Sequence, residues 1–152
     1  MENSNSSTIS SEVCNRIISI IDSNEFVRLD NSIQSADKVV ITDKWIIDLL
    51  SEYHIGYTIP GYIIGFRYHT NDYLGWHRDD MYSKNANLTG GVFLNTNYEG
   101  GLFEFEDKTT QPQIAGLPFI ITRTVVHRVQ PVLSGTRYSL HYILKDKIKK
   151  TI

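Results

Sequence analysis

The chain has 152 residues, of which 41% are hydrophobic and 21% charged, and its formal net charge is −2. These totals fit one globular domain with a buried core, and they give no electrostatic argument for a nucleic-acid partner or an anionic membrane surface. The single cysteine, Cys14, excludes an internal disulfide and fits a reducing compartment.

Residues 1–9 are polar and serine-rich, so we expect a flexible tail. They lack the basic and apolar regions of a secretory signal. No apolar run in the chain approaches the roughly twenty residues that cross a bilayer. We therefore expect a cytoplasmic protein with no membrane partner.

Two helices are predicted after this tail. Ser10 or Ser11 can cap the first, which ends near Asn24 and has its apolar positions on one face: Val13, Ile17, Ile20 and Ile21. A short strand is expected over residues 26–29. The second helix is predicted to start at Thr42-Asp43 and to stop at Gly56, with these residues on one face: Trp45, Ile46, Leu49 and Leu50.

From Pro60 onward, short runs rich in Ile, Val, Tyr and Phe are separated by turn residues, which is typical of an all-β sandwich or barrel. Strands are predicted at residues 61–68, 75–79, 88–94, 101–106, 118–122, 125–132 and 137–144. Two helices followed by these strands favour a mainly-β, cupin-like jelly roll. We expect one domain over residues 10–145, with helical support at 10–58, a jelly-roll core at 59–145 and a polar tail at 146–152.

Three polar residues on these strands have the composition of a non-haem iron site. His77 and Asp79 are two residues apart, so on a strand their side chains point to the same face. His127 adds a second imidazole, and two histidines with one carboxylate leave coordination positions open on Fe(II). The alternatives are a surface histidine beside a carboxylate for His77 and a hydrogen-bonded core residue for His127.

Arg137 and Ser139 share one face of the last predicted strand with His141. An inward arginine is costly unless an anion meets it. Its guanidinium is a planar two-pronged donor, and the hydroxyl of Ser139 can add a third hydrogen bond to the same carboxylate. The alternative is a structural ion pair between Arg137 and Glu104 or Asp107.

Several segments resemble the prolyl 4-hydroxylase branch of the 2-oxoglutarate/Fe(II) dioxygenases. Residues 67–79, RYHTNDYLGWHRD, are similar to the segment that carries the first iron ligands in that branch. Residues 93–95, the Gly100-Gly101 pair and the phenylalanines after it resemble its hairpin. Residues 116–118, 127–129, 131–132 and 135–139 resemble its closing segment in order and spacing. The match extends over roughly Gly61 to Leu144.

The resemblance implies a double-stranded β-helix that hydroxylates an unactivated C–H of a peptidyl or free amino acid such as proline, with release of succinate and CO2. It implies Fe(II), 2-oxoglutarate and O2, with ascorbate as a reductant. It assigns three iron ligands and three cosubstrate contacts: His77, Asp79 and His127 for the metal, and Arg137, Ser139 and Tyr68 for 2-oxoglutarate. For Tyr68, plain packing on a mixed strand is the alternative.

Three positions distinguish the chain from related branches. Many prolyl hydroxylases of this branch carry lysine in place of Arg137. The nucleic-acid demethylase branch has a second arginine where this chain has Ile143, so no nucleic-acid partner is expected. Asp79 favours hydroxylation over halogenation, because the halogenases replace this carboxylate with a small residue.

Three alternatives stay open at this point. They are the same chemistry on a small natural product or nucleoside, a cupin-type metalloenzyme without a keto acid, and a non-catalytic jelly roll. The loop at residues 80–90 would discriminate between substrates, because an open groove favours a peptide and a closed lid favours a small molecule. A cupin-type site would leave Arg137 without a role.

Overall fold

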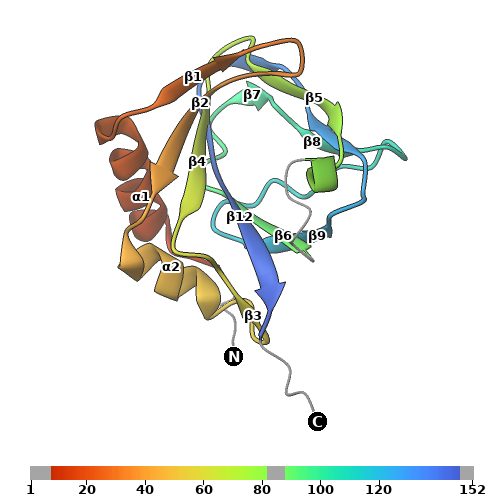
Figure 1. Ribbon diagram of the computed structural model, residues 1–152. Coiled ribbons are helices and arrows are strands. Elements are labelled where there is room, and N and C mark those ends of the chain that lie inside the picture. The colour runs from red at the N-terminus through yellow and green to blue at the C-terminus, as the bar shows by residue number, and fades with distance from the viewer. Residues whose placement is uncertain (1–7, 82–87, 148–152) are drawn as a thin grey trace, which may run out of the picture.

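The computed structural model describes residues 8–81 and 88–147. They form two α-helices, a ten-stranded sheet and a separate pair of strands (Figure 1). In chain order the elements are α1 (Ser11–Ser23), β1 (Val27–Asp30), β2 (Gln34–Ile41), α2 (Lys44–Ser51), β3 (Tyr57–Thr58), β4 (Ile63–Tyr68), β5 (Tyr73–His77), the 3-10 helix η1 (Asp79–Met81), β6 (Leu88–Phe93), β7 (Glu99–Gly100), β8 (Phe103–Phe105), β9 (Phe119–Thr122), β10 (His127–Val129), β11 (Val132–Ser134) and β12 (Arg137–Asp146). Neither helix in the described ranges has the length and apolar character that crossing a bilayer requires.

The large sheet is antiparallel and curls around a hollow. Its strand order is β8-β10-β5-β2-β4-β12-β6-β9, with β1 paired to β2 and β3 paired to β12. Figure 1 shows both helices on one side of β2 and β4, while the curled sheet encloses the opposite side. This arrangement confirms the predicted mainly-β jelly roll with two supporting N-terminal helices.

The curled sheet separates two apolar clusters. The outer cluster joins α1 and α2 to the helix-facing side of β2, β4 and β12, and its members include Ile17, Ile21, Ile46, Leu50, Val39, Ile63 and Leu140. The inner cluster lies in the hollow of the sheet and consists of Ala36, Tyr68, Phe93, Phe103, Ile121, Val129 and Val132. The outer cluster therefore stiffens the strands whose other face lines the hollow.

Helix α1 has the predicted cap and apolar face. The Ser10 hydroxyl accepts a hydrogen bond from a backbone N–H of the first turn, and Asn24 ends the helix. Ile17 and Ile21 are fully buried, and Cys14 is buried beside them. Burial raises the pKa of the Cys14 thiol, so little of it is the reactive thiolate.

Helix α2 ends at Ser51 rather than at the predicted Gly56, and it also differs from its prediction at one position of its apolar face. Ile46 and Leu50 are buried and Leu49 packs against the same cluster, as expected. Trp45 was placed on this apolar face, but it is 36% exposed. The guanidinium of Arg16 lies 4.5 Å from the centre of the Trp45 ring, so the indole forms a cation–π contact with α1 at the surface.

Strand β2 has no counterpart among the predicted strands. Its sequence, QSADKVVI, lacks a clean alternation of apolar and polar residues, and Ser35 and Asp37 are among its buried positions. Asp37 is buried because the Arg67 side chain of β4 pairs with it at 2.9 Å and Arg28 of β1 at 3.3 Å. Ion pairs across strands allow burial of a carboxylate that the local pattern marks as exposed.

Three boundaries also differ from prediction. The strand expected at residues 125–132 divides into β10 and β11 around Pro131, which has no backbone N–H to donate. Ile9 was expected in the flexible tail, but it is buried and its N–H donates to the Gly116 carbonyl at 2.7 Å. Strand β12 continues to Asp146 in the predicted polar tail. Residues 1–7 and 148–152 of the tails, and residues 82–87 of the proposed substrate loop, lie outside the described residues.

We expect Gly90→Ala to lower the free energy of unfolding by about 1–3 kcal/mol, because the added methyl group overpacks the core. Gly90 pairs with Tyr142 across β6 and β12, and a Cβ at Gly90 would overlap the Tyr142 ring. That ring cannot readily move, since its hydroxyl forms a buried 2.6 Å hydrogen bond with His54 Nε2. Urea unfolding measures the change. Gly61→Ala is the matched control, because a Cβ there meets no atom within 4 Å, and equal losses in both variants would contradict this explanation.

Candidate metal centre

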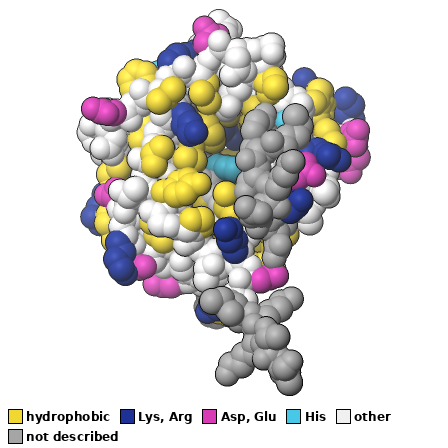
Figure 2. Space-filling model, in the orientation of Figure 1, with side chains coloured by type: hydrophobic (Ala, Val, Ile, Leu, Met, Phe, Trp, Pro, Cys, Tyr) yellow, Lys and Arg dark blue, Asp and Glu magenta, His cyan; other side chains and the backbone are white. Residues whose placement is uncertain are grey.

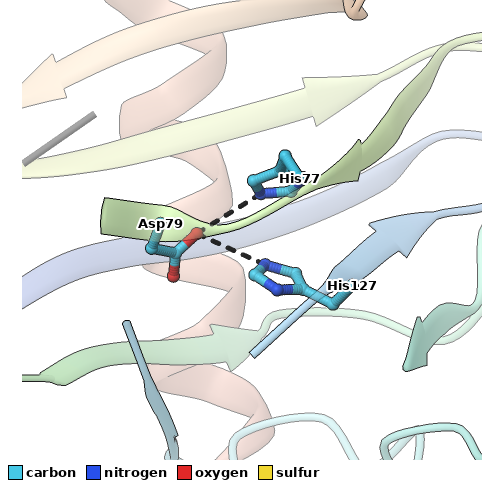
Figure 3. A group of neighbouring side chains, drawn as sticks. All are labelled: His77, Asp79 and His127. Atoms are coloured by element: carbon cyan, nitrogen blue, oxygen red, sulfur yellow. Dashed lines mark ion pairs between the residues drawn. The ribbon is translucent and has the colours of Figure 1, made fainter. Parts of the chain in front are cut away.

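The three predicted ligands come together at one end of the inner cluster. His77 is the last residue of β5 and pairs directly with His127, the first residue of β10. Asp79 was predicted on the same strand as His77, but it begins the 3-10 helix η1 instead. The turn after β5 still directs its carboxylate toward both imidazoles (Figure 3).

The ligand atoms of this group are close enough to share one ion. Nε2 of His77 and Nε2 of His127 each lie 3.3 Å from Oδ1 of Asp79, and the three ligand atoms all lie within 4.8 Å of one another. The side chains are buried, with exposed fractions of 6% for His77, 5% for Asp79 and 2% for His127. The alternative of a surface histidine at position 77 is therefore wrong.

Backbone carbonyls orient both imidazoles. Nδ1 of His77 lies 2.8 Å from the Gly75 carbonyl, and Nδ1 of His127 lies 3.0 Å from the Val125 carbonyl. A carbonyl oxygen only accepts, so each Nδ1 carries a proton and each Nε2 faces the centre, where it donates to Asp79 when protonated and offers its lone pair to a metal when it is not. These bonds hold the two rings in the orientation that a metal requires.

The carboxylate of Asp79 is held in its charged form. Burial by itself raises its pKa, but hydrogen bonds from His127, His141 and His77 outweigh this effect and hold the pKa well below its usual range. Its second oxygen, Oδ2, accepts a hydrogen bond from the Thr89 hydroxyl on β6. Thr89 thus fixes the carboxylate and leaves Oδ1 directed at the histidines.

Arg137 is buried without a carboxylate partner among the residues that the structure describes. It is 2% exposed, its Nε donates to the Gly101 carbonyl at 2.9 Å, and its Nη1 donates to Ser139 Oγ at 3.2 Å. The alternative ion pair is not formed, because Glu104 accepts from Arg128 at 2.7 Å and Asp107 accepts from Thr109.

Two aromatic rings flank the Arg137 guanidinium. Its central carbon lies 5.0 Å from the centre of the Phe93 ring and 5.2 Å from that of Tyr68. Tyr68 is buried, and its hydroxyl accepts a hydrogen bond from Gln34 Nε2 at 2.9 Å. Ser139 is buried on the same strand face as Arg137. The rings restrict rotation of the guanidinium, so a buried cation is presented in a fixed plane.

One cavity connects these groups. It has a volume of about 620 Å³, and its walls include His77, Asp79, His127, Arg137 and Ser139. Figure 2 shows hydrophobic side chains gathered around a histidine in the hollowed part of this face. The volume is that of a small-molecule site. The metal group and the buried arginine therefore face the same enclosed space.

Residues that the sequence did not single out also contribute to the site. Thr89 and the carbonyls of Gly75 and Val125 orient the ligands, and no sequence signal marks such partners. His141 was placed on the face of Arg137 without a role; its Nε2 lies 3.7 Å from Asp79 Oδ2, and it lines the cavity. The period of two along β12 is the signal that could have included it.

Comparisons with known proteins bear on the fold. No protein-family model matches the sequence, and no curated protein matches it. Among solved structures, a prolyl-4-hydroxylase from Pseudomonas putida has a TM-score of 0.77 at 13% identity over 94% of this chain and 91% of its own. A viral collagen prolyl hydroxylase from Paramecium Bursaria Chlorella virus-1, solved as a 2OG complex, has a TM-score of 0.67 at 18% identity over 94% of both chains.

A third similar structure is a prolyl hydroxylase from Trichoplax adhaerens in complex with a hypoxia inducible factor peptide fragment. It has a TM-score of 0.67 at 20% identity over 90% of this chain and 77% of its own. At such identities the similarity establishes the architecture, and the chemistry must be argued from the site. The chain therefore has the fold of the prolyl 4-hydroxylase branch of the 2-oxoglutarate/Fe(II) dioxygenases, as the resemblance in its sequence predicted.

Proposed function

We propose that this protein is a 2-oxoglutarate/Fe(II)-dependent dioxygenase that hydroxylates an unactivated C–H of a peptidyl or free amino acid such as proline, with release of succinate and CO2. One observation carries the proposal: a buried two-histidine, one-carboxylate group and a buried arginine without a carboxylate partner among the described residues line the same cavity. Residues 10–145 are proposed as the single catalytic domain.

The donor atoms fit Fe(II). His77, Asp79 and His127 offer two neutral imidazole nitrogens and one charged carboxylate oxygen, which is the facial set of non-haem iron oxygenases. When bound there with 2-oxoglutarate and O2, iron would supply the oxidising power for the C–H bond. The protein contributes the ligand orientation, since the Gly75 and Val125 carbonyls and the Thr89 hydroxyl fix all three side chains.

The other end of the cavity suits a dicarboxylate cosubstrate. Arg137 would pair with the carboxylate of 2-oxoglutarate that lies far from the metal, and its fixed plane favours a two-pronged contact. Ser139 already accepts from Arg137, so its own O–H is available to donate to the same carboxylate. The Tyr68 ring lies against the guanidinium, and its hydroxyl, which accepts from Gln34, is proposed as a further contact to the cosubstrate. Phe93 and Tyr68 keep water from the guanidinium faces.

The geometry favours this proposal over a cupin-type site without a keto acid. Such a site has no use for a buried arginine, and a guanidinium in the hollow whose charge no described carboxylate matches would cost stability without function. The similar prolyl hydroxylases, one of them in complex with a peptide, support an amino-acid or peptide substrate.

An anaerobic titration tests the proposal. We expect Fe(II) and 2-oxoglutarate together to produce the weak visible charge-transfer band of the chelate, and Asp79→Ala to abolish it, because the variant loses one of three ligands. Absorbance spectroscopy under argon measures both. Iron binding without a 2-oxoglutarate signal would favour the cupin-type alternative, and failure to bind iron would refute both assignments.

A further inference from the structure

The outer part of the cavity is largely apolar. Leu29, Ile33, Tyr62 and Phe66 line it, and all four are at least partly exposed. The polar side chains deeper in the cavity have partners within the protein: Gln34 with Tyr68, Thr89 with Asp79, and Ser139 with Arg137. A substrate entering through the mouth therefore meets few polar groups that can select it.

Lys38 is the charged exception, whereas Asn31 and Ser32, which also line the cavity, are neutral. It lies on β2 two residues after Ala36, whose side chain belongs to the inner cluster, so both side chains point to the hollow. Lys38 lines the cavity and is half-buried, and its ammonium forms no hydrogen bond or ion pair with any other residue in the described part of the chain. An ammonium with its aliphatic stem covered and its charge unmatched suits an anionic ligand.

The strand register fixes the distance between Lys38 and Ser139, which lies at the end of the cavity proposed for the cosubstrate. Lys38 pairs with Phe66 of β4, and Phe66 pairs with Ser139 of β12, so the three residues form one row across the sheet. Neighbouring strands are about 4.8 Å apart, which puts the Cα atoms of Lys38 and Ser139 roughly 10 Å apart. One small molecule can lie between the cosubstrate and Lys38.

The charge balance of the site with Fe(II) and 2-oxoglutarate bound also favours an anionic ligand at Lys38. The two positive charges of Fe(II) and the one of Arg137 match the single negative charge of Asp79 and the two of 2-oxoglutarate. Lys38 is then the one unmatched charge among the described residues that line the cavity. In a largely apolar enclosure an unmatched cation attracts an anion more strongly than it would in water.

We propose that Lys38 binds a carboxylate of the substrate. This inference rests on the proposed function and refines it: the substrate is an amino acid or peptide that presents a carboxylate near the hydroxylated carbon. A free amino acid, a peptide C-terminus and an acidic side chain all supply this group. The apolar walls around Lys38 hold the hydrocarbon part of the same substrate.

A matched pair of probes tests this proposal. N-acetyl-L-proline and N-acetyl-L-prolinamide have nearly the same shape, but only the first carries a charge. Each is titrated into the anaerobic Fe(II)–2-oxoglutarate complex, and the change in the visible band reports binding. We expect the carboxylate to act at a concentration at least about tenfold lower than the amide, because it gains a partly desolvated ion pair. Two further probes then distinguish the sources of the carboxylate. Free L-proline represents a free amino acid, N-acetyl-L-proline a peptide C-terminus, and N-acetyl-prolyl-aspartate diamide an acidic side chain.

Variants test whether Lys38 causes the preference for the carboxylate probe over the amide. Lys38→Met keeps the length of the side chain without its charge and should remove the preference, whereas Lys38→Arg should retain most of it. Lys44→Met is the control, because Lys44 lies on α2, pairs with Asp48 and does not line the cavity. The proposal is overturned if the two probes change the visible band of the unmodified protein at equal concentrations, or if neither changes it. It is also overturned if Lys38→Met still prefers the carboxylate probe to the amide. Absence of the band before any probe is added refutes the proposed function itself.

Discussion

Replacement of His77 with alanine is expected to reduce succinate formation from 2-oxoglutarate by at least about a thousandfold. His77 supplies one of the three buried ligand atoms that the described residues bring together, and its Nε2 is fixed toward Asp79 by the bond between Nδ1 and the Gly75 carbonyl. Alanine leaves one imidazole and one carboxylate, which hold iron weakly. The measurement is succinate release at saturating Fe(II), with iron content determined in the same samples.

His69→Ala is the matched control for this variant. The His69 side chain is half exposed and does not line the cavity, and its Nε2 bonds to Asp37 at 2.8 Å. It should retain turnover. Thermal unfolding of both variants separates loss of the metal from loss of the fold. Turnover in His77→Ala close to that of the unmodified protein would remove His77 from the metal centre.

Local patterns were sufficient to predict the elements whose burial follows a simple period. The spacing of Ile17 and Ile21 located the buried face of α1, and alternation along β12 placed Arg137 and Ser139 on the inner face. These predictions succeed because a helix repeats every 3.6 residues and a strand every two. The period of this strand groups Arg137 with Ser139 on one face, and the resemblance to the dioxygenases then assigned that face to the site.

Strand β2 shows where such patterns fail. Its buried Asp37 depends on Arg28 and Arg67, which lie on other strands, so its burial is decided by contacts that a local window does not contain. The consequence is functional as well as structural. Gln34, which bonds to Tyr68, and Lys38, which lines the cavity, both come from this strand.

The position of Asp79 was predicted for a reason that is only partly right. Its carboxylate does lie beside His77, but η1 brings it there rather than the alternation of a strand. The resemblance in sequence gave the correct pair because it matches the residues together with their turn. The partners that orient the ligands, Thr89 and two backbone carbonyls, depend on tertiary geometry and have no sequence signal.

Arg137→Ala is expected to raise the 2-oxoglutarate concentration needed for half-maximal turnover by about a hundredfold, because two charge-assisted hydrogen bonds to the far carboxylate are lost. The requirement for Fe(II) should change little, since Arg137 touches none of the three metal ligands. Steady-state titrations of each component, with the other saturating, measure the two effects separately.

Comparing the Fe(II) and 2-oxoglutarate requirements of Arg137→Ala distinguishes a specific binding role from a structural one. Arg137 also packs between Phe93 and Tyr68, so its loss disturbs the hollow as well as the proposed cosubstrate contact. A general disturbance would weaken iron and 2-oxoglutarate together, whereas loss of a specific anion site weakens only the second. Arg137→Lys keeps a charge of the kind found in many prolyl hydroxylases and should recover part of the affinity. Arg16→Ala, at the surface beside Trp45, should change neither requirement. Equal shifts for iron and 2-oxoglutarate in Arg137→Ala would show that this arginine supports the fold and does not bind the cosubstrate.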